Sequence, residues 1–66
     1  MRYPKGKTPA QLTEDIGRLG LEEHDLGYID GYLRAGDSRP YAIFVREDDG
    51  LISAVPINCL KALFDS

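Results

Sequence analysis

Residues 41–57 read YAIFVREDDGLISAVPI, with an apolar run on each side of an Asp-Gly pair. Both runs are rich in β-branched and aromatic residues, and Asp49-Gly50 favours a tight turn between antiparallel strands. The stretch therefore predicts a β-hairpin. Pro56 has no N–H to donate within a sheet, so it marks a strand end or a free edge.

Both faces of this hairpin are apolar. In its first strand, Tyr41, Ile43 and Val45 alternate with Ala42 and Phe44. A sheet with one solvated face alternates apolar and polar residues, so we expect both faces to be covered. The sequence allows two ways to cover them. Either the sheet curls into a small barrel with a helix against it, or the chain forms a homodimer through its second apolar face.

The pattern near the N-terminus predicts a helix from about Thr8 to Leu19. Thr8-Pro9-Ala10-Gln11 supplies an N-cap hydroxyl, a proline at the first helical position and a glutamine that completes a capping box. Three apolar residues then recur at helical spacing, namely Leu12, Ile16 and Leu19. Gly20 supplies a C-terminal stop.

The middle segment has two interpretations. With period two it is a strand in which Tyr28, Asp30 and Tyr32 face one way, and Gly27 and Gly31 permit a bulge or a sharp bend. With helical period, a stripe is formed by Leu26, Ile29 and Leu33. The strand is favoured, because each glycine weakens a helix by about 1 kcal/mol relative to alanine. Residues 35–40 are predicted to form a loop.

The strand interpretation gives three strands followed by Val55-Pro56-Ile57-Asn58-Cys59-Leu60. This ending resembles the Pro-x-Asn-aromatic-Val tail of SH3-like barrels, where a single helical turn enters a final short strand. Tyr28-Ile29-Asp30-Gly31-Tyr32 is similar to the acidic and aromatic opening of SH3 domains. The chain has no Trp, and Cys59 replaces the aromatic residue after Asn58. The resemblance therefore implies the SH3-like fold alone. We expect an α+β domain: the N-terminal helix, a three-stranded antiparallel meander curling into an SH3-like small barrel, and a short C-terminal helical turn.

A second resemblance concerns residues 12–21. With Leu19-Gly20-Leu21 after an amphipathic segment, they resemble the first helix and turn of phage-repressor-type helix-turn-helix domains. A recognition helix there would be acidic, however, since Arg34 is its single basic residue. Its acidic residues would be Glu22, Glu23, Asp25 and Asp30.

Length and composition set the remaining bounds. The 66 residues suit one small domain, which we place at residues 8–66 after a flexible basic tail at residues 1–7. The net charge of −3 and the pI near 4.9 argue against a nucleic-acid partner. A single cysteine cannot form an internal disulfide, and no apolar run is long enough for a membrane helix. We therefore expect a cytoplasmic protein that does not bind membranes.

The chain offers few residues for catalysis or metal binding. Glu22-Glu23-His24-Asp25 is the densest cluster of possible ligands, and it reads as a solvated acidic loop because one His beside flexible acids supplies too few donors. Cys59 reads as a small apolar side chain in the final turn. Nothing combines a nucleophile, a base and an orienting group, so we expect neither an enzyme nor a metal or cofactor.

By elimination, the sequence predicts a non-enzymatic protein–protein interaction module, such as a small bacterial or mobile-element regulator, that binds another protein or a second copy of itself. Its expected contact face comprises Tyr28, Tyr32, Arg34, Arg39 and Tyr41. The alternative is a nucleic-acid-binding regulator, either helix-turn-helix-like or an Sm-like barrel. Its phosphate-binding residues would be Arg2, Lys5, Lys7 and Arg18.

Overall fold

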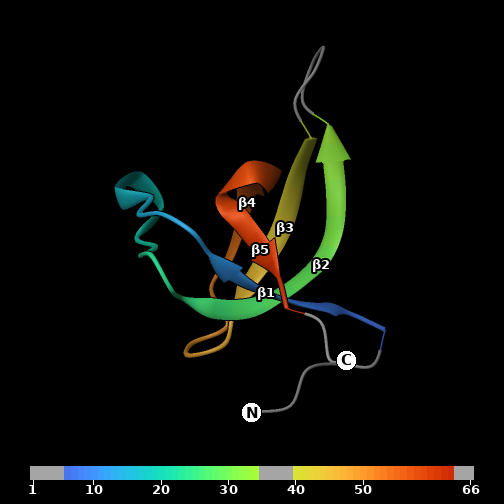
Figure 1. Cartoon of the computed structure of the whole chain (residues 1–66), viewed down its shortest axis with the longest axis horizontal. Coiled ribbons are helices and arrows are strands. Elements are labelled where there is room, and N and C mark those ends of the chain that lie inside the picture. The colour runs from blue at the N-terminus through green and yellow to red at the C-terminus, as the bar shows by residue number, and fades with distance from the viewer. Residues whose placement is uncertain (1–5, 35–39, 64–66) are drawn as a thin grey trace.

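A computed structural model describes residues 6–34 and 40–63 of the chain. These residues form one antiparallel sheet with the strand order β4-β3-β2-β1-β5 (Figure 1). The strands are β1 (Thr8–Leu12), β2 (Leu26–Arg34), β3 (Pro40–Arg46), β4 (Ile52–Pro56) and β5 (Leu60–Ala62). Two single 3-10 turns, η1 (Gly17–Leu19) and η2 (Ile57–Cys59), lie between strands.

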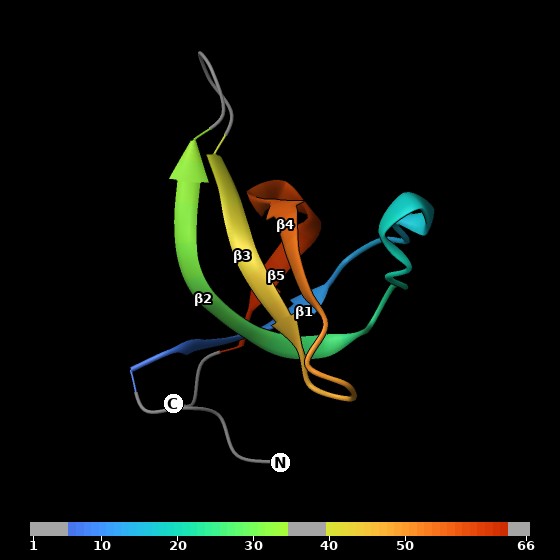
Figure 2. The same ribbon diagram turned by 180° about the vertical axis from the view of Figure 1, so that it is seen from behind.

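The sheet is curled into a half-barrel, a shape compatible with a small barrel fold. The first residues of the long strand β2 pair with β1, and most of its length pairs with β3. The strand bends strongly along its course (Figures 1 and 2). A β-bulge lies in β2 between Ile29 and Gly31. Bulges bend a strand and increase its twist, so the position of this one fits the curl of the sheet.

The core lies on the inner, concave face of the sheet. Phe44 is fully buried at its centre, directly opposite Ile29 on β2 and Ser53 on β4. The rest of the buried cluster is aliphatic: Ala10, Leu12, Leu21, Ile29, Ala42 and Val55. Close packing also explains Gly27, because a Cβ on this residue would overlap the Val45 carbonyl oxygen and lie 2.8 Å from Phe44 Cζ.

The predicted helix over Thr8–Leu19 is wrong. Residues 8–12 form β1, and the next residues form a loop closed by mutual backbone hydrogen bonds between Ile16 and Leu21. The apolar stripe that suggested a helix still reaches the core, since Leu12 is buried and Ile16 and Leu19 pack against the buried cluster. Strand pairing with β2 and β5 therefore places Leu12 in the core, and the segment after β1 brings Ile16 and Leu19 against the same core.

The number of strands and the chain ending also differ from the prediction. The described residues hold five strands instead of three, and no α-helix, so the fold is mostly β and not α+β. A short helical turn is present at Ile57–Cys59, but the chain then continues as β5 beside β1. The hairpin is confirmed as β3 and β4, and the strand interpretation of the middle segment is confirmed as β2.

The outer face of β3 and β4 stays apolar without the expected helix. The outward positions on β3 and β4 are occupied by uncharged residues, namely Tyr41, Ile43, Val45, Ile52, Ala54 and Pro56. Their exposure differs widely, from 9% for Val45 to 66% for Ile52. No helix in the described part of the chain has the length and apolarity to cross a membrane.

Candidate functional site

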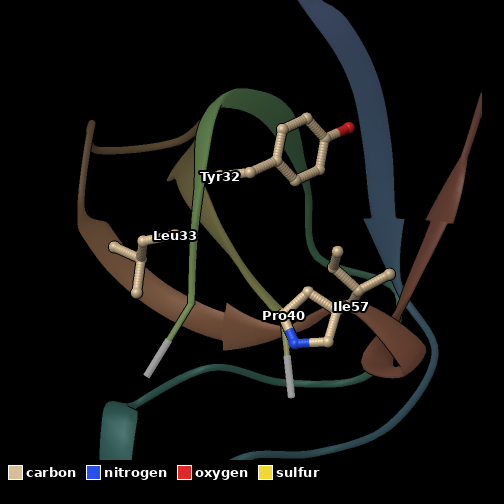
Figure 3. A pocket seen from close by; sticks show the side chains of 4 residues that line it. All are labelled: Tyr32, Leu33, Pro40 and Ile57. Atoms are coloured by element: carbon tan, nitrogen blue, oxygen red, sulfur yellow. The ribbon is translucent and has the colours of Figure 1, made fainter. Parts of the chain in front are cut away.

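An open pocket of about 440 Å³ lies where β2 ends, β3 begins and η2 approaches them (Figure 3). Four residues line it: Tyr32, Leu33, Pro40 and Ile57. Figure 3 shows that Tyr32, Pro40 and Ile57 project to one side of β2, while Leu33 projects to the other. The pocket is therefore built mainly from three side chains supplied by three different elements.

The bulge in β2 places Tyr32 in this pocket. Ile29 lies opposite Phe44, but the next pairs are Gly31 with Ile43 and Tyr32 with Ala42. Residues directly opposite each other share a face of the sheet, so Tyr32 is on the inner face with buried Ala42. It is nevertheless 64% exposed, because the half-barrel is open at this end.

The pocket is chemically simple. Its lining is aliphatic and aromatic, and the Tyr32 hydroxyl is the one side-chain polar group among the four lining residues. Sites of this kind bind apolar groups, and one or two polar atoms set the orientation. The four described lining residues supply neither a nucleophile nor a carboxylate pair.

The expected contact face is divided by the fold. Tyr28 lies opposite Val45 and Tyr41 opposite Leu33, which places both on the outer face, away from Tyr32. Arg34 ends β2 opposite Pro40, beside the pocket. Arg39 is outside the described residues. Sequence reasoning assumed uninterrupted alternation between Tyr28 and Tyr32, and the extra residue at the bulge breaks that alternation.

Three of the four pocket residues are not predicted as site residues by the sequence. It places Leu33 in the middle strand, Pro40 in a loop, and Ile57 in the second strand of the hairpin. Pro56 is the sequence signal that could have placed Ile57 in the pocket. A strand that ends at a proline allows the next residue to turn inward.

The residues of the nucleic-acid alternative do not form one patch in the described chain. Lys7 precedes β1 and binds Asp30, with Nζ 2.8 Å from the carboxylate Oδ1 and 3.2 Å from the Asp30 carbonyl oxygen. Arg18 lies in η1, beyond the other end of β1. The whole of β1, a five-residue strand about 17 Å long, lies between them in the chain. Arg2 and Lys5 are outside the described residues. The helix-turn-helix form of this alternative is wrong, because β1 and a loop occupy its first helix.

Arg46 is the centre of a polar cluster. Its side chain is 19% exposed and donates hydrogen bonds to Asp49, to Asp25 and to the Gly20 carbonyl oxygen. The bond from Arg46 and the N–H of Leu51 lower the pKa of Asp49 from 3.8 to about 2. The same bonds, first Asp49 and then Asp25, raise the pKa of Arg46. The cluster joins the loop after β1 to the β3–β4 hairpin.

The acidic segment 22–25 has structural roles. Asp25 Oδ2 accepts the Glu22 N–H at 3.0 Å, and Asp15 Oδ1 accepts the Glu23 N–H at 2.8 Å. His24 has a left-handed backbone, with φ of 77°. Over residues 6–34 and 40–63, no three His, Cys, Asp or Glu residues are grouped to hold a metal ion.

Cys59 is half-buried in η2, with Sγ 3.4 Å from Glu14 Oε2. Burial, and then the hydrogen bond to the Glu14 carboxylate, raise the pKa of the thiol. A protonated thiol is a poor nucleophile, so this cysteine is in the opposite environment to a catalytic one.

Comparison of the chain with protein-family models, with curated proteins and with solved structures finds no match. Its function must therefore be inferred from its own side chains.

Proposed function

We propose that this domain is a non-enzymatic protein-interaction module that binds an apolar side chain of a partner protein in the pocket between Tyr32, Pro40 and Ile57. The observation that carries the proposal is the position of Tyr32. It faces the inner side of the sheet, where its neighbour Ala42 is fully buried, yet 64% of its own surface is open.

An exposed tyrosine beside an apolar hollow is typical of a binding surface. Aromatic residues are enriched at interfaces, because a rigid ring buries a large area at a small entropic cost. The ring of Tyr32 and the side chains of Pro40 and Ile57 provide three apolar walls (Figure 3). Excluding water from these walls would supply most of the binding free energy.

The pocket suits one class of ligand, an extended segment that presents an aliphatic or ring side chain. The Tyr32 hydroxyl lies at its rim and can donate a hydrogen bond to a backbone carbonyl of that segment. None of the four described lining residues carries a charge that would select a charged side chain. A single pocket of this size supports modest affinity, with a Kd of about 10–100 μM.

The finer assignment of the fold belongs to the same proposal. We infer an SH3-like small barrel, because η2 enters the last short strand, β5, as the resemblance of residues 55–60 implied. The β4-β3-β2-β1-β5 order, with the bent strand β2 at its centre, supports this inference.

Two observations support a protein partner over nucleic acid. The ammonium group of Lys7 is already paired with Asp30, and the chain carries a net charge of −3. Phosphate binding needs basic groups that can displace counterions, and the four described lining residues offer none.

Selection of peptides tests the proposal. Random peptides displayed on phage are selected against the immobilised domain, and their affinities are measured by fluorescence anisotropy. We expect Tyr32→Ala to weaken binding at least tenfold, and Tyr28→Ala, the same change on the outer face, to alter it less than twofold. Amide spectra of both variants establish that they are folded.

Other outcomes would overturn the proposal. Selected peptides that bind Tyr32→Ala as tightly as the unchanged domain would show that the pocket is not the site. A mixed-sequence oligonucleotide that binds at low salt, with affinity falling steeply as salt rises, would favour the nucleic-acid alternative.

A further inference from the structure

One long edge of the sheet is open. Strand β4 pairs with β3 on one side, and within residues 6–34 and 40–63 no strand lies on its other side (Figure 2). An open edge presents unpaired backbone N–H and C=O groups, which can pair with a further strand. The identity of the free groups on β4 follows from its pairing with β3.

The free groups belong to Ile52 and Ala54. The N–H of Arg46 donates to the Leu51 carbonyl at 2.9 Å, which fixes the alternation of bonds along the hairpin. Ser53 and Val55 then direct their backbone groups toward β3. The N–H and C=O of Ile52 and Ala54 point to the open edge, and β4 ends at Pro56, which has no N–H.

Within Ile52–Pro56, this edge carries no guarding charge. Proteins guard open edges with charged side chains, above all lysine. β5, at the other end of the sheet, is only three residues long and carries Lys61. β4 has no charged residue, and two of its outward side chains, Ile52 and Ala54, are exposed, Ile52 at 66%. Of the two edge strands, β4 is therefore the longer one and the one without a charge.

We propose that β4 pairs antiparallel with β4 of a second copy of the chain, about a two-fold axis at Ser53. In this register Ile52 lies opposite Ala54 of the partner subunit, and Ala54 opposite Ile52 of the partner subunit. Each of these pairs exchanges two hydrogen bonds, so every free N–H and C=O of Ile52 and Ala54 is used. Ser53 lies opposite Ser53 of the partner subunit.

The strand is complementary to itself, and this commits the proposal to a second copy. A two-fold interface brings identical surfaces together, which a charged edge would resist and an uncharged one permits. The side chains also fit, because a large one, Ile52, packs beside a small one, Ala54 of the partner subunit, on the outer face. A domain with so small a core gains stability from such pairing.

Sedimentation velocity and amide hydrogen exchange of the full chain test the pairing. We expect a mass near 7.3 kDa at about 10 μM and a rise toward twice that value at about 1 mM. At the higher concentration, the amides of Ile52 and Ala54 should exchange at least about tenfold more slowly than at the lower one. The Ser53 and Val55 amides, bonded to β3, should be protected at both.

Two variants separate edge pairing from other contacts. Ile52→Lys adds the missing edge charge, and Ala54→Pro removes an N–H that points away from β3, so both should stay folded and monomeric at about 1 mM. Leu26→Lys is the control, because Leu26 is 39% exposed on the outer face of β2, away from the edge, and this variant should still dimerise. Amide spectra report folding.

Three results would overturn the proposal. The first is a monomer at about 1 mM. The second is a dimer in which the Ile52 and Ala54 amides exchange freely, since the contact must then lie on another face. The third is a monomer whose Ala54 amide is protected only when a selected peptide is added, which would assign the edge to a foreign strand and leave the Tyr32 pocket to be judged by its own experiment.

Discussion

The Arg46 Nη1 lies 3.1 Å from Asp25 Oδ2, and this ion pair joins two segments that are 21 residues apart in the chain. Arg46 ends β3 at the start of the hairpin turn, while Asp25 ends the long loop between β1 and β2. The same guanidinium holds Asp49 across the turn at 2.8 Å. Because the planar group has several donors at fixed angles, it can hold both carboxylates and the Gly20 carbonyl at once.

Removing the guanidinium should loosen both segments together. Arg46→Met keeps the aliphatic stem and deletes every bond from the side chain to Asp25, Asp49 and Gly20. We expect the Tm to fall by roughly 5–10 °C, and amide exchange to accelerate in residues 20–25 and 47–50. Circular dichroism and hydrogen exchange measure the two effects. Lys61→Met, at an exposed position on β5, is the control and should change the Tm little. An unchanged Tm in Arg46→Met would contradict this role.

The pKa of Asp49 predicts a pH dependence of stability. Its value of about 2 in the folded chain lies below the 3.8 of an unperturbed aspartate, so folding favours the charged form. The resulting stabilisation is complete above pH 3.8 and is lost as the pH falls toward 2. Thermal unfolding of the unchanged chain and of Asp49→Asn should therefore differ most at neutral pH and converge near pH 2. A difference in Tm that stays constant from pH 7 to pH 2 would rule out this linkage.

Gly27 should tolerate no side chain. A methyl group there would overlap the Val45 carbonyl oxygen and press against the buried ring of Phe44, so either the β2–β3 pairing or the core must shift. We expect Gly27→Ala to lower the free energy of unfolding by about 2–3 kcal/mol in urea titrations. Gly31→Ala is the matched control in the same strand, because nothing lies within 4 Å of its added methyl, and its effect should be small. If the two substitutions changed the free energy of unfolding equally, the loss at Gly27 would come from backbone entropy and not from crowding.

The parts of the fold that were predictable are those fixed by local chemistry. Asp49-Gly50 places a residue with φ of 74° at the turn, and the flanking β-branched runs can do little except pair. β1 was not predictable in this way. Its capping signal and apolar spacing fit a helix locally, and pairing with two distant strands, β2 and β5, overrides them. The shorter alternation of buried Ala10 and Leu12 with Gln11 was present but spans too few residues to outweigh the helical pattern.

The candidate site was predictable only in part, because its geometry depends on one extra residue. Tyr32 was expected at a contact surface, and it lines the pocket. Its expected partner Tyr28 lies on the opposite face, since the bulge between Ile29 and Gly31 reverses the alternation. Glycines in the sequence permit a bulge but do not locate it. Ile57 reaches the pocket through the path of η2, which depends on tertiary packing.

The thiol of Cys59 should be slow to react, and Glu14 should be part of the reason. Its pKa is raised above 9.0 by burial and by the Glu14 carboxylate 3.4 Å away, so the thiolate is scarce at pH 8. We expect alkylation by iodoacetamide at pH 8 to be slower in the folded chain than in urea. Glu14→Gln removes the negative charge but keeps the burial, so the pH–rate profile should move to lower pH and the rate at pH 8 should rise about two- to fivefold. Asp15→Asn, the same kind of change one residue away, is the control. A profile that Glu14→Gln leaves in place would mean that burial alone protects the thiol.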